Sequence, residues 1–243
     1  MMYREIRPRP AYAETIECFW ESRDSDRVHR VMPDGCADIL FTMDGGRASL
    51  TVVGPMTRFE DFRLSAGGVL TGARFRPGMW TANLRVSGHQ LTDVRPPLDG
   101  FWGQRAAHLA ERLADARSIE DRARLLEGAI RPAATDPLQR ALQALERSRG
   151  CVEMDELASW CGISTRQLRR RCLERTGLTP KLLARILRFR HAFEGLPGDR
   201  RDFAQFALEC GFYDQAHLIN EFRAFAGRTP MAVFSNREGV VVA

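Results

Sequence analysis

Positive charge is concentrated between residues 166 and 190, where nine basic side chains stand with one acid. The formal net charge of the whole 243-residue chain is only +5, so this stretch is far more basic than its surroundings. The planar guanidinium of arginine donates several hydrogen bonds at once and can pair with a phosphate or with the edge of guanine. Taken alone, the run is also compatible with a solvated helix face. The segment in which the run lies favours a role in binding nucleic acid.

The basic stretch begins in one copy of a segment that occurs twice, about 50 residues apart. Residues 158–163 (ASWCGI) return as 207–212 (ALECGF), and residues 176–180 (TGLTP) return as 226–230 (AGRTP), with one extra residue in the second turn. Each copy predicts a helix, a glycine turn and a second helix that stops at a glycine followed by a proline. This is the outline of a helix-turn-helix, whose second helix enters the major groove of DNA. Two copies imply that one subunit contacts two neighbouring segments of duplex.

The second helix of each copy is expected over 165–176 and 215–226. On an ideal helix, Leu168 and Cys172 face inward in the first copy, and the arginines share the opposite face. Arginine pairs with guanine, glutamine and asparagine pair with adenine, and alanine touches the methyl group of thymine. The residues that we expect to read bases are Arg166, Arg169, Arg170, Gln215, Ala216 and Asn220.

A helix over 181–194 is expected to connect the two motifs. Its 14 residues would span roughly 21 Å, enough with the width of the motifs to hold two reading helices about one turn of DNA apart. Asp136 and Pro137 start a supporting helix over 137–149. The residues that we expect to contact phosphates are Ser164, Arg171, Lys181, Arg185 and His217.

The first half of the chain alternates short strand-like runs with glycine and proline turns. The runs at 15–22, 28–32, 37–43, 49–53, 59–64 and 69–75 predict a small antiparallel β-barrel or sandwich, with helices following over 79–86, 101–116 and 118–130. We therefore expect an α+β chain of two domains. The first covers 1–131; the second, 132–243, is all-α with helix-turn-helix motifs at about 150–177 and 201–227.

The C-terminal half, roughly 136–235, resembles the DNA-binding domain of the AraC/XylS family of bacterial transcription regulators. The resemblance rests on residues 157–158, 161–164, 166–170 and 176–180 in the first motif, and on 211–212, 214–218, 221–223 and 227–230 in the second. Cys172 stands where the family usually has an aromatic side chain, which suggests a slightly looser core. The resemblance implies base contacts at the same six positions and a partner in double-stranded DNA, with RNA polymerase as a further partner.

The N-terminal half resembles, more loosely, a domain found ahead of this unit in bacterial regulators, through residues 32–40, 53–55 and 72–78. By analogy it implies a cupin-like domain that binds a small-molecule effector and forms a homodimer. The residues that we expect in the effector pocket are Asp34, Cys36, Asp38, Arg74 and Arg76, where guanidiniums and free amides could bind an anion. The alternative is that these residues form a turn and internal ion pairs.

Other classes of function lack their signatures. The six cysteines show no Cys-x-x-Cys pair or zinc spacing, and His29 and His89 are scattered, so we expect no metal and no cofactor. We find no catalytic triad, paired carboxylates or phosphate-binding loop, and expect no enzyme activity. No signal peptide or long apolar run is present, and we expect a cytoplasmic protein. Two alternatives stay open. One is a regulator with a reactive Cys36, which senses alkylation or oxidation although its carboxylate neighbours disfavour the thiolate. The other is a protein-binding co-regulator.

Overall fold

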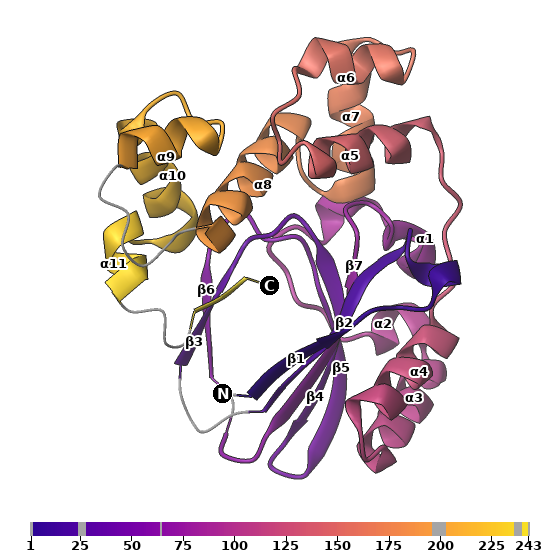
Figure 1. Ribbon diagram of the computed structural model, residues 1–243. Helices are drawn as coiled ribbons and strands as arrows, with labels where there is room; N and C mark the ends of the chain where they lie inside the picture. Colours follow the sequence, from indigo (N-terminus) through magenta and orange to yellow (C-terminus); the bar gives the residue numbers. More distant parts are fainter. Residues whose placement is uncertain (1, 24–27, 64, 196–202, 236–239, 243) are drawn as a thin grey trace.

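The computed structural model describes residues 2–23, 28–63, 65–195, 203–235 and 240–242. Its N-terminal half is built on a five-stranded antiparallel sheet with the strand order β1-β2-β7-β4-β5 (Figure 1). The strands are β1 (Met2–Ile6), β2 (Ile16–Arg23), β4 (Ala37–Asp44), β5 (Arg47–Val53) and β7 (Val69–Phe75). The central strand β7 is fully paired on both sides, with Ala73 opposite Phe19 on one side and Ile39 on the other.

Two helices, α3 (Gln104–Asp115) and α4 (Ile119–Ala129), cover one face of this sheet. The core between them includes Phe19 and Phe41 from the sheet and Leu113 and Leu126 from the helices, all at most 2% exposed. Short elements connect the layers: η1 (Pro10–Tyr12), α1 (Thr81–Leu84), η2 (Gly88–Gln90) and α2 (Asp99–Trp102).

A second, three-stranded sheet has the order β6-β3-β8, from β3 (Val28–Met32), β6 (Glu60–Arg63) and β8 (Val240–Val242). Phe62 of β6 packs with Trp20, Leu40, Val53 and Leu70 on the other face of the main sheet. The α+β fold class is confirmed, with the N-terminal half closer to a sandwich than to a barrel. The main sheet is not closed, because β1 and β5 each pair with one strand among the residues that the structure describes.

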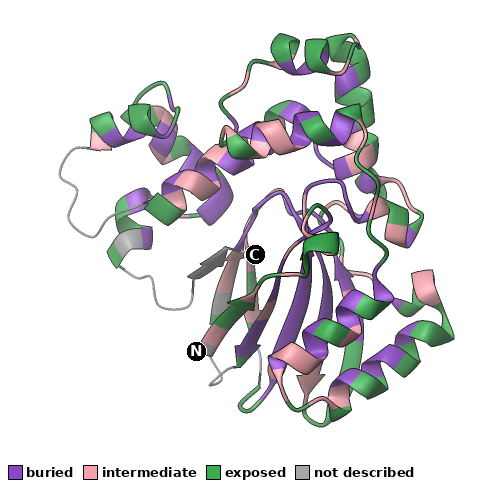
Figure 2. Ribbon diagram, turned by 45° about the vertical axis from the view of Figure 1, so that its right-hand side comes forward, coloured by how far each residue is buried: buried purple, intermediate pink, exposed green. Residues whose placement is uncertain are grey.

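The C-terminal half is helical around one core. Figure 1 shows α8 running diagonally between the pair α6/α7 and the pair α9/α10. Figure 2 shows that the buried sides of these helices face one another and the sheet below them. The helices are α5 (Pro137–Arg147), α6 (Met154–Trp160), α7 (Thr165–Thr176), α8 (Pro180–Gly195), α9 (Phe203–Glu209), α10 (Gln215–Ala226) and α11 (Pro230–Ser235).

Several expectations differ from the structure. The helix expected over 79–86 is the single turn α1, because Arg85 adopts the left-handed conformation (φ 55°) and ends it. The strands β1 and β8 were not expected, and β8 pairs in parallel with β3 across the predicted boundary at 131/132. Residue 64 of the expected fifth strand and residues 201–202 of the second motif lie outside the described residues.

The two halves pack closely. Met32, at the end of β3, is fully buried in the core of the C-terminal helices. Gly35 (φ +85°) lies so near Leu183 of α8 that a Cβ at this position would collide with the leucine side chain. The short linker after α4 therefore joins two units that are docked on each other.

Candidate nucleic-acid interface

The first motif is α6, a turn through Gly162 (φ +63°) and α7. Ser164 caps α7: its Oγ accepts a hydrogen bond from the N–H of Gln167 at 3.3 Å, and the Gln167 side chain accepts one from the N–H of Ser164 at 3.0 Å. This capping box satisfies two amides that a helix start leaves without partners. The start of α7 is thereby fixed by its own sequence.

Burial fixes the rotation of α7 about its axis. Leu168 and Cys172 are at most 1% exposed, whereas Arg166, Arg169 and Arg170 are exposed. Within the described part of the chain, the guanidiniums of Arg166 and Arg169 have no hydrogen-bond or ion-pair partner. Arg170 pairs with Glu174 one turn later, at 3.0 Å. The face that the sequence predicted to read bases is thus turned to solvent, with two of its three arginines unengaged.

The second motif repeats this arrangement with different chemistry. Asp214 caps α10 by accepting a hydrogen bond from the N–H of His217 at 2.7 Å. Gln215, Ala216 and Asn220 are exposed. The inward face consists of Leu218, Phe222 and Phe225, all at most 2% exposed.

One exposed residue beside this face was not predicted. Tyr213 precedes the cap of α10 and is 86% exposed, the largest value among the exposed large hydrophobic residues of the described chain. It is the extra residue of the second turn, and that insertion was the available signal.

The five expected phosphate contacts fall into two groups. Ser164, Arg171 and Lys181 are exposed. Arg185 instead donates two hydrogen bonds to the carboxylate of Glu221, at 2.9 and 2.7 Å, and lies over the ring of Phe225. His217 is half-buried, and its Nδ1 accepts a hydrogen bond from the N–H of Tyr213 at 3.3 Å. Arg185 and His217 therefore have internal partners that hold α8 and the turn before α10.

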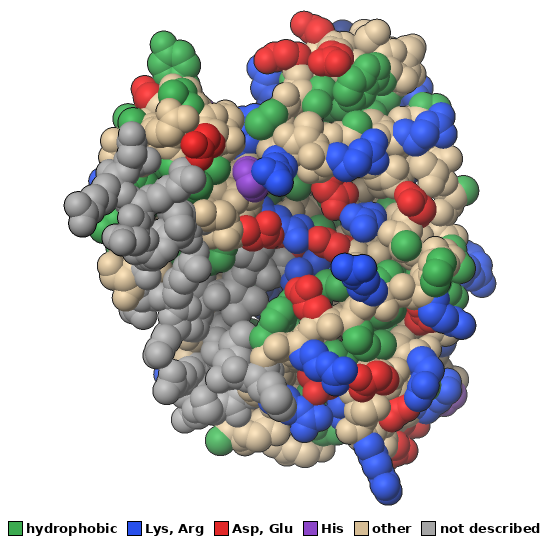
Figure 3. All heavy atoms as spheres, in the orientation of Figure 1, with side chains coloured by type: hydrophobic (Ala, Val, Ile, Leu, Met, Phe, Trp, Pro, Cys, Tyr) green, Lys and Arg blue, Asp and Glu red, His purple; other side chains and the backbone are tan. Residues whose placement is uncertain are grey.

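Charge on one face of the molecule is mixed (Figure 3). On the side shown in Figure 3, basic and acidic side chains lie interspersed rather than forming one basic field. The basic surface of interest is therefore the local one on α7 and the start of α8.

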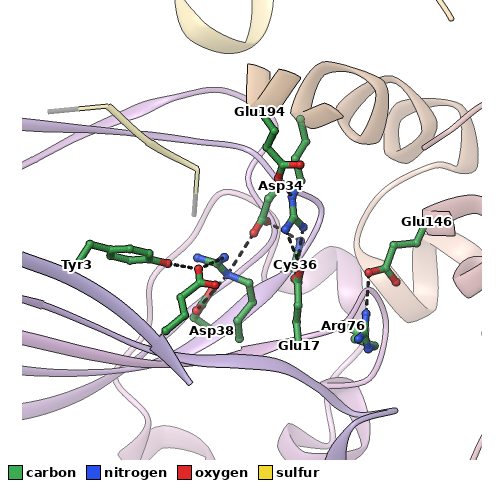
Figure 4. Close-up of polar contacts among 11 residues, drawn as sticks. Tyr3, Glu17, Asp34, Cys36, Asp38, Arg76, Glu146 and Glu194 are labelled. Carbon is green, nitrogen blue, oxygen red and sulfur yellow. Dashed lines mark hydrogen bonds and ion pairs between the residues drawn. The ribbon is translucent and has the colours of Figure 1, made fainter. Parts of the chain in front are cut away.

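Four of the five expected effector residues meet in one buried cluster at the end of the sheet (Figure 4). Arg74 Nε lies 3.3 Å from an oxygen of Asp34 and 3.9 Å from one of Asp38. The N–H of Cys36 donates a hydrogen bond to Asp34 at 2.7 Å, and the indole of Trp20 donates one to Asp38 at 2.6 Å. All four residues are at most 4% exposed. The turn and ion pairs of the alternative interpretation are therefore present.

Arg76 lies apart from this cluster. Its guanidinium donates hydrogen bonds to the carbonyl of Ala13 at 2.9 Å and to Glu146 of α5 at 2.8 Å, as Figure 4 shows for Glu146. Arg76 thus joins the two halves of the molecule rather than the Asp34 group.

The cluster is joined to α8 by a pair that the sequence did not suggest. Arg190 donates hydrogen bonds to the carboxylate of Glu17 at 2.6 and 3.3 Å, and the Cys36 thiol donates to the same carboxylate at 3.3 Å. Glu17 and Arg190 are 173 residues apart, so no local pattern could have linked them.

Burial and charge act on the titration of these groups in different directions. Burial raises the pKa of Asp34 to about 7 even though Arg74 and Arg190 lie close by. Burial would also raise the pKa of Glu17, but the Arg190 guanidinium outweighs it and holds that pKa at about 2. Burial, with the charges of Asp34 and Glu17, raises the pKa of the Cys36 thiol well above its usual value. The thiolate of Cys36 is thus disfavoured.

Glu17, Asp34 and Cys36 place possible metal ligands within 4.8 Å of one another. Both oxygens of Glu17 already bind Arg190, and Arg74 lies against Asp34. The negative charges of the group are therefore balanced by guanidiniums, an arrangement that suits ion pairing better than a cation site.

An open groove of about 630 Å³ follows the linker between the halves. Arg85, Arg131 and Arg175 line it, and its apolar lining includes Ala82 of α1 and the flanking Met79 and Val86. Arg175, near the end of α7, pairs with Asp136 at 2.6 Å. This groove, unlike the Asp34 cluster, is accessible from solvent. No helix in the described ranges is long and apolar enough to span a bilayer.

Comparison with known proteins agrees with this geometry. Residues 157–236 match a family described as a helix-turn-helix domain, and residues 4–97 match a domain of unknown function (DUF6597). No curated protein matches the chain.

Solved structures of regulators are among the matches. A transcriptional regulator from Chromobacterium violaceum with an AraC-type DNA-binding domain is 26% identical over 42% of this chain and 91% of its own, with a TM-score of 0.37. ToxT from Vibrio cholerae is 11% identical over 97% of this chain and 98% of its own, with a TM-score of 0.47. ToxT bound to an unsaturated fatty acid is 12% identical over 89% and 94%, with a TM-score of 0.44.

Proposed function

We propose that the AraC-type helix-turn-helix domain at the C-terminus of this chain binds double-stranded DNA sequence-specifically and thereby regulates transcription. The observation that carries the proposal is that α7 and α10 are oriented in the same way relative to the core. Each helix buries its apolar face in the shared core and exposes the polar face predicted to read bases. Since burial fixes their rotation, the same side chains always face outward.

The two helices suit different parts of a site. Arg166 and Arg169 on α7 bring guanidiniums that have no partner among the described residues, and these favour guanine and add attraction for phosphate. Gln215 and Asn220 on α10 bring amides, which favour adenine. We infer that α7 supplies more of the affinity and that α10 refines the sequence preference.

The connecting helix supports contact with two half-sites. The 16 residues of α8 span roughly 24 Å at 1.5 Å each. With the width of a motif at each end, this length suits reading helices about one turn of DNA apart, roughly 34 Å. Double-stranded DNA contacted on one face is thus the proposed ligand.

Selection of the full-length protein on randomised duplex DNA tests this function. The expected result is an enriched site with two half-sites, whose base preference is lost in one half for Arg169→Ala and in the other for Asn220→Ala. Arg112→Ala, which removes an exposed arginine from α3, is the matched control and should leave the site unchanged. Absence of any enriched sequence would contradict the proposal.

We also propose that a small anionic effector controls DNA binding through the N-terminal half. Two ion pairs that join the halves, Arg76–Glu146 and Arg190–Glu17, support this idea, because an anion bound to either guanidinium would compete with its carboxylate. The expected group of Asp34, Cys36, Asp38 and Arg74 adjoins the Arg190–Glu17 pair, because the Cys36 thiol donates a hydrogen bond to Glu17 and Arg190 lies close to Asp34. An effector regulates only if it prefers one docking arrangement over another.

A thermal-shift screen of the full-length protein against small carboxylates and phosphates tests this control. A compound that raises the melting temperature should also change the DNA affinity, and its effect should weaken in Arg76→Met. A stabilising compound that leaves DNA affinity and oligomeric state unchanged would argue against an effector role for the site.

The geometry favours control by a small anionic effector over the alternative of a reactive Cys36 that senses alkylation or oxidation. The thiol is 3% exposed, is hydrogen-bonded to Glu17, and has a raised pKa from burial and nearby carboxylates. Reactive cysteines are usually accessible and lie in electropositive surroundings.

A further inference from the structure

The two reading helices end in the same way, at positions that correspond in the repeat. Gly177 ends α7 (φ 77°) and Gly227 ends α10 (φ 66°), and the N–H of each glycine bonds back into its helix. The last carbonyls of a helix have no partner within the helix and must find one elsewhere. At both helix ends, the N-terminal half provides contacts.

The end of α7 is held by residues 87–92. Thr92 Oγ1 donates a hydrogen bond to the carbonyl of Gly177 at 2.8 Å, and Ser87 Oγ donates one to the carbonyl of Glu174 at 3.3 Å. Gly88 lies so close to the backbone of Gly177 that a Cβ on Gly88 would overlap it. The ring of Pro55 also lies against Gly177.

The end of α10 is held by Arg30 and Phe59. Arg30 donates a hydrogen bond to the carbonyl of Ala226 at 3.3 Å, and its guanidinium lies 4.0 Å from the centre of the Phe59 ring. The edge of this ring fills the space beside Gly227 that a Cβ would need. Asp61 accepts two hydrogen bonds from Arg30, at 2.7 and 2.8 Å, and fixes its orientation.

The two contacts belong to one short loop. Pro55 touches the end of α7, and Phe59, four residues later, touches the end of α10. Figure 1 shows the region between β5 and β6 beneath α8. We call residues 54–59 the strut. Four residues of extended chain reach at most about 14 Å, so the strut limits how far the two helix ends can separate.

The strut is itself braced. Asp93 accepts hydrogen bonds from the N–H and the hydroxyl of Thr57, at 2.7 and 2.6 Å, and its own N–H donates to the carbonyl of Pro55 at 3.1 Å. The N–H of Gly54 donates to the carbonyl of Val94 at 3.1 Å. Residues 87–92, which hold the end of α7, directly precede Asp93 in the chain. The strut and the contacts at the end of α7 are therefore linked through residues 87–94.

We propose that the strut, braced by Asp93, fixes the separation and relative rotation of α7 and α10 and so sets the half-site spacing that the protein accepts. The proposal rests on the proposed DNA-binding function. The shared core joins each motif to α8, and the strut adds a second link between the ends of α7 and α10 that restricts bending and twisting of α8 between them. One added base pair shifts a half-site by about 3.4 Å and rotates it by roughly 35°, which a fixed pair of helices cannot follow. Phe59 and Asp93 are positioning residues in this scheme.

The test measures affinity against spacing. The full-length protein is titrated with its selected site and with versions in which one base pair is added or removed between the half-sites. The wild type should lose at least tenfold in affinity at either altered spacing. Phe59→Ala and Asp93→Ala should reduce that loss to less than threefold. Phe101→Ala, which removes a partly buried phenylalanine of α2 that belongs to neither the strut nor its brace, is the control and should keep the wild-type profile.

The outcomes separate the two proposals. If no sequence is enriched in the selection, the DNA-binding function fails and the strut proposal fails with it. If a two-part site is enriched but Phe59→Ala and Asp93→Ala keep the wild-type spacing ratio, only the strut proposal is overturned. Circular dichroism and melting curves establish that each variant is folded. If either does not fold, Thr57→Val, which removes one hydrogen bond of the brace, takes its place with the same expected flattening.

Discussion

Arg190, in the helix that connects the two motifs, binds the carboxylate of Glu17 on the β-sheet through hydrogen bonds of 2.6 and 3.3 Å. Both side chains are 19% exposed, so solvent screens this pair less than a surface pair. Within the residues that the structure describes, this is the only ion pair between α8 and β2. It lies beside the buried group of Asp34, Cys36 and Arg74. The docking of the two halves is therefore linked to protonation of Glu17.

The first prediction concerns stability against pH. The folded-state pKa of Glu17, about 2, lies below its ordinary value of 4.5, so its contribution is full above about pH 5 and is lost as the pH falls towards 2. The contribution is at most about 3 kcal/mol. Urea unfolding of the wild type and Glu17→Gln should show a difference that is largest near pH 7 and shrinks by pH 3. A difference that does not depend on pH would contradict the assignment.

The second prediction distinguishes base readers from exposed arginines in general. Arg169→Ala should cost about 1–3 kcal/mol in binding to the selected site and relax its base preference, because a bidentate contact to guanine is lost. Arg170→Ala should have a smaller effect, since Arg170 already pairs with Glu174. Fluorescence anisotropy with matched and mismatched duplexes measures both effects. An unchanged preference in Arg169→Ala would remove this residue from the readers.

The third prediction concerns phosphate contacts. With six to eight contacts, the logarithm of affinity should fall with the logarithm of salt concentration at a slope of roughly −5 to −7. Lys181→Ala and Arg171→Ala should each make the slope shallower by about 1 and weaken all sequences alike. The slope is obtained from titrations at several salt concentrations. A slope near zero for the wild type would be incompatible with this interface.

The fourth prediction follows from the internal partners of Arg185. Arg185→Ala removes the guanidinium that pairs with the carboxylate of Glu221, a side chain that is only 8% exposed. We expect a loss of about 1–2 kcal/mol in unfolding free energy, reduced from the buried-pair range because the Arg185 side chain is 42% exposed. Arg185→Lys, which keeps the charge, should recover part of it. Unchanged stability in chemical unfolding of Arg185→Ala would indicate that the pair is not structural.

The fifth prediction addresses the cysteines. Cys151 is exposed, whereas Cys36 is buried with a raised pKa, so a thiol reagent should modify Cys151 first and Cys36 only on unfolding. Mass spectrometry after brief labelling at pH 8 identifies the modified residue. Rapid labelling of Cys36 in the folded protein would revive the reactive-cysteine alternative.

The reading helices could be predicted from sequence because their limits are set locally. The caps at Ser164 and Asp214 and the stops at Gly177 and Gly227 lie within or beside each helix, and the predicted ranges 165–176 and 215–226 agree with α7 and α10. The inward and outward faces followed from the helical period. Base and phosphate contacts stay predictions.

What joins the halves could not be predicted in this way. Glu17 and Arg190, and likewise Thr92 and Gly177, become neighbours only when the whole chain is folded. The sequence grouped Arg76 with Arg74 because both lie on one strand face, but Glu146 of a distant helix takes the Arg76 guanidinium. Strand β8 pairs with β3 from the other end of the chain, and no periodic pattern indicates such a partner.

The most direct measurement of the central claim is a cycle between protein and DNA. Affinities are measured for the wild type and the Arg166→Ala/Arg169→Ala variant on the selected site and on two versions with one half-site scrambled. Scrambling either half should weaken the wild type, more for the guanine-containing half. The affinity of the variant should fall little further when the guanine-containing half is scrambled. Scrambling the other half should still reduce the affinity of the variant by the same factor as that of the wild type. Equal losses for the wild type and the variant at both halves would contradict the claim that α7 and α10 of one subunit read separate halves of the site.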